Sequence, residues 1–180
     1  MRFSRNIEKI NMSKTAEVAD LALSLKEQGH KIVNMATGEL SFKPALSVRK
    51  EACRTINKGE TLYTQVAGLK ELRDLISAKL KKDLNIEYKC DEIIVSNGGK
   101  QVIYNALQST INRGDEVIII SPYWVSYPEI IKLCGGKPKV LNTKRREGFS
   151  INTEKLEKLI TSKTKWIILN SPNNPTGVVY

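Results

Sequence analysis

Ser96-Asn97-Gly98-Gly99-Lys100-Gln101 is the stretch that decides the fold. It follows the apolar run Ile93-Ile94-Val95 and precedes apolar residues at helical spacing in residues 102–111. This order predicts a strand, a tight turn and the start of a helix. The first N–H groups of a helix have no partner inside it, and the helix dipole adds partial positive charge there. An anion such as a phosphate is therefore favoured at this turn, although the same turn also serves as a plain connector.

The glycines of this turn do not match either of the two common phosphate-binding fingerprints. A Walker A loop is excluded because no Gly-Lys-Ser/Thr follows a glycine at the required distance. A dinucleotide fingerprint is excluded because the third glycine is missing. The identity of a ligand must therefore come from elsewhere in the chain.

The chain beyond residue 91 alternates between apolar runs and helical patterns. Strands that alternate with helices imply right-handed crossovers, so the sequence predicts an α/β fold with a parallel sheet. Strands are expected at residues 93–95, 117–120, 140–141 and 166–169, and helices at 101–112, 126–134 and 153–162. Before this region, helices are expected at residues 13–28, from Pro44 to about Gly59, and from Leu69 onward, with a loop between Gly59 and Gly68.

Three polar or aromatic segments follow predicted strands of this sheet. They are residues 96–100, 121–124 and 170–177. Ligands of parallel sheets collect beyond the C-terminal ends of the strands, so these segments are expected to converge. An anion-binding turn, the ring of Trp124 and an amide-rich turn together suit a flat, phosphorylated, heteroaromatic ligand. Taken singly, a tryptophan or an Asn-Pro turn is ordinary packing or an ordinary turn.

The charge of the chain is strongly basic but is spread along its length. The 29 Lys and Arg residues exceed the 19 Asp and Glu residues, which gives a net charge of +10. Only Lys144-Arg145-Arg146 forms a compact basic cluster, and Glu147 follows it directly. Such a run is typical of a solvated surface, so the charge alone gives weak support for nucleic-acid binding.

The cysteines and the hydropathy limit the compartment and the metal chemistry. Cys53, Cys90 and Cys134 are widely spaced and form no CxxC pair, so neither a disulfide framework nor a zinc site is indicated. We expect reduced, buried thiols. No run approaches the ~18 apolar residues of a membrane span, and no signal-peptide core is found, which favours a cytoplasmic protein.

The three post-strand segments, in this order, resemble those of class I aminotransferases of the pyridoxal-phosphate fold-type I superfamily, above all the bacterial aspartate aminotransferases. The resemblance covers nearly the whole chain. The matched motifs are the glycine turn at residues 35–42, Tyr63 before Ala67-Gly68, Gly98-Gly99-Lys100-Gln101, Gly114-Asp115-Glu116-Val117, Ser121-Pro122-Tyr123-Trp124 and the turn at residues 170–177. The resemblance implies an N-terminal arm and small-domain segment at residues 1–44 and an incomplete large cofactor-binding domain at residues 45–180.

The resemblance implies pyridoxal 5'-phosphate as cofactor and gives a role to each matched residue. The backbone N–H groups of Gly99 and Lys100 would hold its phosphate. Trp124 would stack on its pyridine ring. The amide of Asn174 would donate a hydrogen bond to the 3-oxygen of the ring.

Further roles concern the substrate and a second subunit. Gly38 resembles a glycine whose backbone approaches the substrate carboxylate, and Trp124 and Asn174 are also expected beside the substrate. Tyr63 is similar to a tyrosine that reaches across a dimer interface to the phosphate of the neighbouring subunit. A homodimer is therefore implied.

Two departures from the family pattern affect what is expected. Leu40-Ser41-Phe42 stands where the family usually has Pro-Asp-Phe. The Schiff-base lysine, the acidic partner of the pyridine nitrogen and the substrate arginine of the family all lie C-terminal to the motif of Asn174, and the printed sequence ends at Tyr180. We expect the intact relative to transfer amino groups between an amino acid, aspartate by subgroup, and a 2-oxo acid. Residues 1–180 alone are expected to be inactive and poorly folded.

Three alternatives remain open from the sequence. Another fold-type I enzyme, such as a lyase or a synthase acting on an amino acid, would share the same motifs. A non-catalytic product of a split or decayed gene would share them too. A nucleic-acid-binding role is the third alternative and rests on the charge alone.

Overall fold

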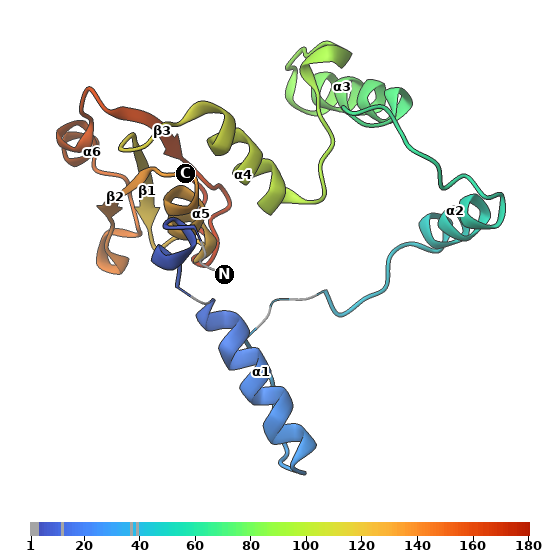
Figure 1. Ribbon diagram of the computed structural model, residues 1–180, viewed down its shortest axis with the longest axis horizontal. Coiled ribbons are helices and arrows are strands. Elements are labelled where there is room, and N and C mark those ends of the chain that lie inside the picture. The colour runs from blue at the N-terminus through green and yellow to red at the C-terminus, as the bar shows by residue number, and fades with distance from the viewer. Residues whose placement is uncertain (1–3, 12, 37, 39) are drawn as a thin grey trace. The chain divides into compact units, whose positions relative to one another are not determined.

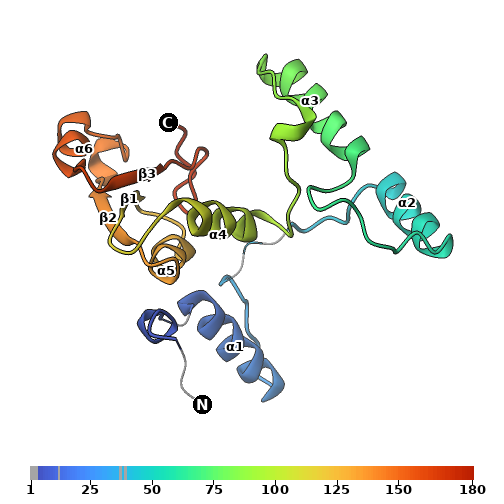
Figure 2. The ribbon, with the colours of Figure 1, turned by 45° about the horizontal axis from the view of Figure 1, so that its top comes forward.

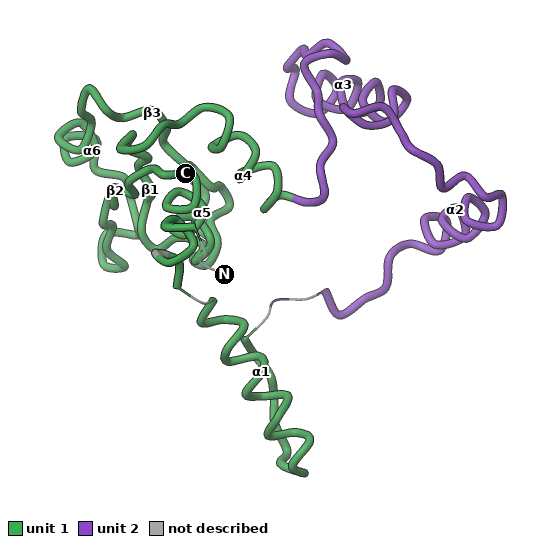
Figure 3. The backbone as a smooth tube through the Cα atoms, viewed as in Figure 1, with its two compact units in different colours: residues 1–36, 99–180 green, residues 37–98 purple. Residues whose placement is uncertain are grey.

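The computed structural model describes residues 4–11, 13–36, 38 and 40–180. The chain divides into two compact units, Met1–Ala36 with Gly99–Tyr180, and Thr37–Gly98 (Figure 3). The first unit contains a sheet, and the second contains two helices and the loop with Tyr63. The domain boundary predicted at residue 44 stays a prediction.

Apart from residues 93–95, the helices and strands follow the predicted order. The first unit contains η1 (Ile7–Lys9), α1 (Lys14–Glu27), α4 (Gly99–Thr110), β1 (Glu116–Ser121), α5 (Ser126–Leu133), β2 (Lys137–Asn142), η3 (Arg145–Glu147), α6 (Thr153–Leu159) and β3 (Thr164–Ile168). The second unit contains α2 (Leu46–Asn57), α3 (Lys70–Leu84) and η2 (Cys90–Glu92).

The sheet of the first unit is parallel, with the strand order β2-β1-β3 (Figures 1 and 2). Ile118 of the central strand pairs with Lys139 of β2 on one side and with Ile167 of β3 on the other. The predicted α/β class and the predicted parallel pairing are therefore confirmed. Because all three strands run the same way, the segments that follow them leave from the same edge of the sheet.

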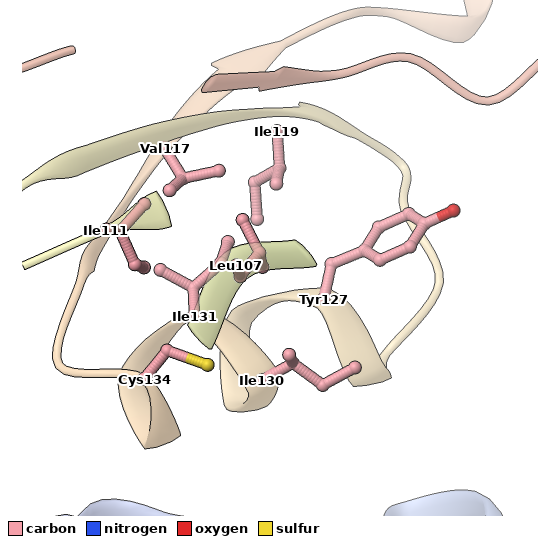
Figure 4. Close-up of a cluster of buried hydrophobic side chains, with 8 residues drawn as sticks. All are labelled: Leu107, Ile111, Val117, Ile119, Tyr127, Ile130, Ile131 and Cys134. Carbon is pink, nitrogen blue, oxygen red and sulfur yellow. The ribbon is translucent and has the colours of Figure 1, made fainter. Parts of the chain in front are cut away.

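Helices cover both faces of β1, which explains its uninterrupted apolar sequence. Val117 and Ile119 point to the face covered by α4 and α5, where the larger buried cluster lies (Figure 4). Ile118 and Ile120 belong to a second cluster on the other face, and residues of α6 pack against it. The first three of these four side chains have no exposed surface, and Ile120 is 6% exposed.

The strand predicted at residues 93–95 is wrong, since these residues form no strand in the described chain. A strand requires a ladder of hydrogen bonds to a neighbour. Here the N–H of Val95 donates to the carbonyl of Ala67 at 3.0 Å, and Ile94 is 71% exposed. Gly68 makes the close approach possible, because a Cβ there would lie 2.8 Å from the Cβ of Val95. Residues 93–95 are thus an extended segment held by backbone hydrogen bonds from Val95 to Ala67 and from Ile93 to Cys90.

The cysteines are free thiols, but the prediction that all are buried is wrong for Cys53, which is exposed. Cys90 is half-buried, and only Cys134 belongs to the core. Burial raises the pKa of Cys134, which keeps this thiol protonated. Within the described ranges, His, Cys, Asp and Glu side chains form no group that would hold a metal ion. No helix in that part of the chain is long and apolar enough to cross a membrane.

The core around Ile131 gives a first prediction. Ile131 has no exposed surface and packs in the cluster between the sheet and α4 and α5. Replacing it with Ala should lower the free energy of unfolding by about 2–5 kcal/mol, since the cavity adds to the lost burial. Denaturant unfolding of the natural polypeptide that contains the chain measures the loss. Ile160→Ala is the matched control because Ile160 is 50% exposed, and equal losses in both variants would contradict this account of the core.

Candidate functional site

Helix α4 begins at Gly99, two residues before the predicted range of 101–112, and provides the first element of the site. The N–H groups of its first turn have no partner within the helix, and the helix dipole favours an anion there. Gly98, before the helix, has a φ of +83°, which glycine adopts without strain. A Cβ placed at Gly99 would meet no atom within 4 Å, so the space beside this backbone is open. The geometry fits the donor set of a phosphate site.

Trp124 lies in the connection between β1 and α5 and is fixed from the core side. Its ring meets Tyr127 edge to face, with 5.5 Å between the ring centroids and an angle of 89° between the planes. The N–H of Tyr127 also donates to the carbonyl of Trp124 at 3.0 Å. Tyr127 is 7% exposed, and burial raises its pKa. A half-buried indole is thus held against a rigid neighbour.

Lys100 connects the helix start to this indole. Its Nζ lies 5.1 Å from the centroid of the Trp124 ring, within the range of a cation–π contact. The structure therefore brings together two segments that the sequence predicted to converge, the turn before α4 and the segment after β1. The side chain of Lys100 faces the ring, while its backbone belongs to the first turn of α4.

The turn after β3 carries two consecutive asparagines in different environments. Asn174 is exposed, and its backbone N–H donates to Oδ1 of Asn170 at 2.9 Å. Asn173 is buried, and its Nδ2 donates to the carbonyl of Pro122 at 3.0 Å and to Oγ1 of Thr176 at 2.8 Å. The turn is thus attached to the segment after β1, and the amide of Asn174 is left at the surface.

Gly38 and Tyr63 belong to the second unit, so their predicted places beside the other site residues stay predictions. The side chain of Tyr63 is fully exposed, with a relative exposure of 107%. Gly38 likewise has open space where a Cβ would stand. Both properties are compatible with contacts to another molecule or subunit.

Arg73 of α3 fixes the loop that follows Tyr63, and the sequence reasoning missed it. Its guanidinium donates to the carbonyl of Gly68 at 3.2 Å, to the carbonyl of Cys90 at 2.9 Å and to Oε1 of Gln65 at 2.8 Å. An arginine on a helix normally indicates a solvated face. The sequence feature that could have indicated this role is the position of Arg73 in the first turn of a helix that directly follows the glycine-containing loop.

A cavity of about 740 Å³ lies next to this region, between the N-terminal segment and α5. Lys100 and Tyr123 line it, but Gly99, Trp124 and Asn174 are not among the described residues at its walls. We therefore do not equate the cavity with the cofactor site. Its remaining described lining residues are Ile10, Asn11, Ser13, Lys14, Glu17, Val125, Ser126, Pro128, Glu129, Ile130 and Leu133.

Glu129 ties the N-terminal segment to α5 beside this cavity. One of its oxygens accepts from the N–H of Asn11 at 3.0 Å, and the other accepts from Nζ of Lys132 at 2.9 Å. Burial acts to raise the pKa of Glu129, but the hydrogen bonds from Lys132 and Asn11 outweigh it, so the pKa is lowered. A second attachment is the bond from Nδ2 of Asn6 to the carbonyl of Leu133.

The parallel α/β fold of the first unit is that of the fold-type I class of pyridoxal-phosphate enzymes. The chain belongs to the family of class I and II aminotransferases, whose profile matches residues 30–180. It is 42% identical to an aspartate aminotransferase of Bacillus subtilis over 180 residues, which is 100% of this chain and 46% of that protein. It is 41% identical to an aspartate/prephenate aminotransferase of Nitrosomonas europaea, of which it covers 45%.

Solved structures give the same assignment. An aspartate aminotransferase of Thermus thermophilus with maleate matches all of this chain with a TM-score of 0.96 and 40% identity. An aspartate aminotransferase of Thermotoga maritima matches 99% of it with a TM-score of 0.94 and 40% identity. The chain covers 47% and 48% of those two chains, so it spans about half the length of the proteins it matches.

The lowered pKa of Glu129 gives a pH prediction. A carboxylate whose pKa is lower in the folded state contributes stability above its unfolded pKa of about 4.3, and this contribution is lost as the pH falls through the folded value. Acidification to that range should therefore weaken the attachment of Asn11 to α5, while the bond from Asn6 to Leu133 does not titrate. Hydrogen-exchange protection at Asn11, whose N–H bonds to Glu129, measures the release.

Glu129→Gln is the matched variant, because an amide keeps an acceptor oxygen but does not titrate. Its protection at Asn11 should vary less with pH than that of the unsubstituted protein. An identical pH dependence in the two proteins would show that Glu129 does not control the attachment.

Proposed function

We propose that the polypeptide containing this chain transfers amino groups between an amino acid and a 2-oxo acid, with pyridoxal 5'-phosphate as cofactor. The observation that carries the proposal is the meeting of three segments at one edge of the sheet. These are the open helix start at Gly99, the indole of Trp124 with Lys100 beside it, and the turn of Asn174 attached through Asn173. The aminotransferase relatives support it.

The residues of the chain fit the chemical groups of the cofactor one by one. The backbone N–H groups of Gly99 and Lys100 would bind the phosphate, because a helix start favours a dianion. The indole of Trp124 would lie against the pyridine ring and limit its tilt. The amide of Asn174 would donate to the 3-oxygen and favour its ionised form. When bound, the cofactor supplies an electron sink that lets an amino acid lose its α-proton.

The substrate class is proposed from the relatives. Aspartate and a dicarboxylic 2-oxo acid are favoured, because the relatives named above carry aspartate in their names. Gly38 would present its backbone to the substrate carboxylate, and Trp124 and Asn174 would border the substrate. We also propose a homodimer in which Tyr63, fully exposed in its own chain, contacts the phosphate bound by the other subunit.

The direct test is conversion of aspartate with 2-oxoglutarate by the natural polypeptide that contains these residues, with and without added pyridoxal phosphate. Turnover that depends on the cofactor supports the proposal. Cofactor binding with cleavage or β-replacement of the amino acid in place of transamination would overturn it.

Substitutions at Trp124 and Lys100 test the site. Trp124→Ala should weaken cofactor binding by about 2- to 12-fold, the value of an aromatic contact of 0.5–1.5 kcal/mol. Lys100→Ala should cost less, because the proposed contact is its backbone N–H. Equilibrium dialysis against pyridoxamine 5'-phosphate, which cannot condense with lysines, measures both. A larger loss in Lys100→Ala than in Trp124→Ala would contradict the assignment.

Mixed dimers test the role of Tyr63. Tyr63→Phe and Trp124→Ala subunits are unfolded together and refolded, so that hybrid dimers form. If Tyr63 serves the site of the other subunit, a hybrid has one site with both substitutions and one with neither, and activity should exceed that of either parent dimer. Activity equal to the mean of the two parents would place Tyr63 in the site of its own subunit.

A further inference from the structure

Asn173 and its neighbour Asn174 lie in different environments. Asn173 is 7% exposed, the sole buried polar residue in the described part of the chain, while Asn174 is exposed. A buried amide is retained in a protein only when its donors are satisfied, since an unpaired polar group in the interior costs free energy. Both Nδ2 hydrogens of Asn173 are used, one on the carbonyl of Pro122 and one on Oγ1 of Thr176.

The backbone of Asn173 is held as firmly as its side chain. Its N–H donates to the carbonyl of Val178 at 2.8 Å, and its carbonyl accepts from the N–H of Gly177 at 2.7 Å. The residue is thus bonded within its own turn on three sides, through Thr176, Gly177 and Val178. The fourth bond, to Pro122, leaves the turn and crosses to a segment 51 residues earlier.

The two ends of this crossing bond lie next to the residues proposed to touch the cofactor. Pro122 is two residues before Trp124, and Asn173 directly precedes Asn174. The backbone pairing of β1 with β3 runs from Glu116 to Ile119 on the β1 side, so it ends before either segment. Beyond that pairing, the amide of Asn173 joins the segment that carries the indole to the turn that carries the exposed amide.

The chemistry of the bond requires an amide. An aspartate would have the same shape but would place a carboxylate oxygen against the carbonyl oxygen of Pro122, and two acceptors repel. An alanine would leave that carbonyl without its donor. Neither substitution changes the side chain of Trp124 or of Asn174.

We propose that Asn173 is a positioning residue that fixes the amide of Asn174 relative to the indole of Trp124, and thereby the ionisation of the cofactor's 3-hydroxyl. This inference rests on the proposed function. Asn173 itself contacts neither substrate nor cofactor. It acts by holding two segments from the ends of neighbouring strands at a constant separation.

The test compares Asn173→Ala, Asn173→Asp and Asn174→Ala with Asn142→Ala as the matched control. Asn142 is exposed at the end of the adjacent strand β2. The natural polypeptide that contains the chain is titrated with pyridoxamine 5'-phosphate, and binding is followed by tryptophan fluorescence. Asn173→Ala should weaken binding by about tenfold, the equivalent of 1.4 kcal/mol, because the half-buried carbonyl of Pro122 loses its donor. Asn142→Ala should bind as the unsubstituted protein does.

A spectroscopic readout separates positioning from simple loss of stability. The 3-hydroxyl of the bound probe is titrated by absorbance. Asn173→Ala should shift its ionisation to higher pH, in the direction of Asn174→Ala, and the double variant should show no further shift beyond Asn174→Ala. An effect of Asn173→Ala that adds in full to that of Asn174→Ala would overturn the proposal.

The aspartate variant supplies a rescue. Burial raises the pKa of a carboxyl group, and the protonated form has an O–H that can donate to the carbonyl of Pro122. The affinity of Asn173→Asp relative to Asn173→Ala should therefore improve as the pH is lowered through the pKa of the new carboxyl group. A constant ratio would argue against the bond to Pro122 as the cause.

The outcomes distinguish this inference from the function on which it rests. If the unsubstituted protein does not bind pyridoxamine 5'-phosphate, the proposed function fails and the inference fails with it. If that protein binds and Asn173→Ala matches Asn142→Ala in affinity and absorbance, the inference alone is overturned. If both Asn173 variants lack a cooperative thermal transition at every pH, Asn173 is a stability residue, which also overturns it.

Discussion

The burial of β1 on both faces is the constraint on which the rest of the first unit depends. Four consecutive apolar side chains can leave water only if elements lie above and below the strand, and the chain supplies α4 and α5 on one side and α6 on the other. The crossovers that place these helices force β2 and β3 to run parallel to β1. Parallel strands then send the segments with Trp124 and Asn174 away from the same edge.

The site takes its rigidity from this core. Tyr127 belongs to the buried cluster and at the same time contacts the ring and the carbonyl of Trp124. Lys100 is the second residue of α4, and this helix contributes Leu107 to the same cluster. Ile111, which directly follows the helix, belongs to the cluster as well. The indole of Trp124, which stands in a connecting segment, and the backbone donors at the start of α4 are therefore both positioned by packed elements. Such an arrangement is what a preorganised binding site requires.

The sequence allowed a correct prediction wherever a residue's environment follows from its neighbours in the chain. The run Val117-Ile118-Ile119-Ile120 identified the central strand, and the glycines before Lys100 identified the start of α4. The run at residues 93–95 has the same composition as a strand but pairs with no strand in the described part of the chain, and pairing is a property of the whole fold. Cys53 shows the same limit, since a thiol on a helix does not reveal which face is covered.

The two asparagines show the limit most clearly for the site. Adjacent identical residues carry no signal about which amide turns inward, because that choice depends on the carbonyl of Pro122, which is remote in the chain.

The apolar stripe of α1 is a related case. Its Val18 and Leu21 are 53% and 59% exposed, so the periodicity predicted the helix but not a covering surface.

The guanidinium of Arg73 has a consequence for the order in which the chain can fold. Its three acceptors lie 5, 8 and 17 residues away, so the loop after Tyr63 is closed by contacts that are local in sequence. The bond between Asn173 and Pro122 spans 51 residues. Closing a short loop costs less chain entropy than closing a long one, and folding slows as contacts become more distant in sequence. We therefore expect the loop of Tyr63 to acquire its shape early, while the separation of Trp124 and Asn174 is set only after β1 and β3 have paired.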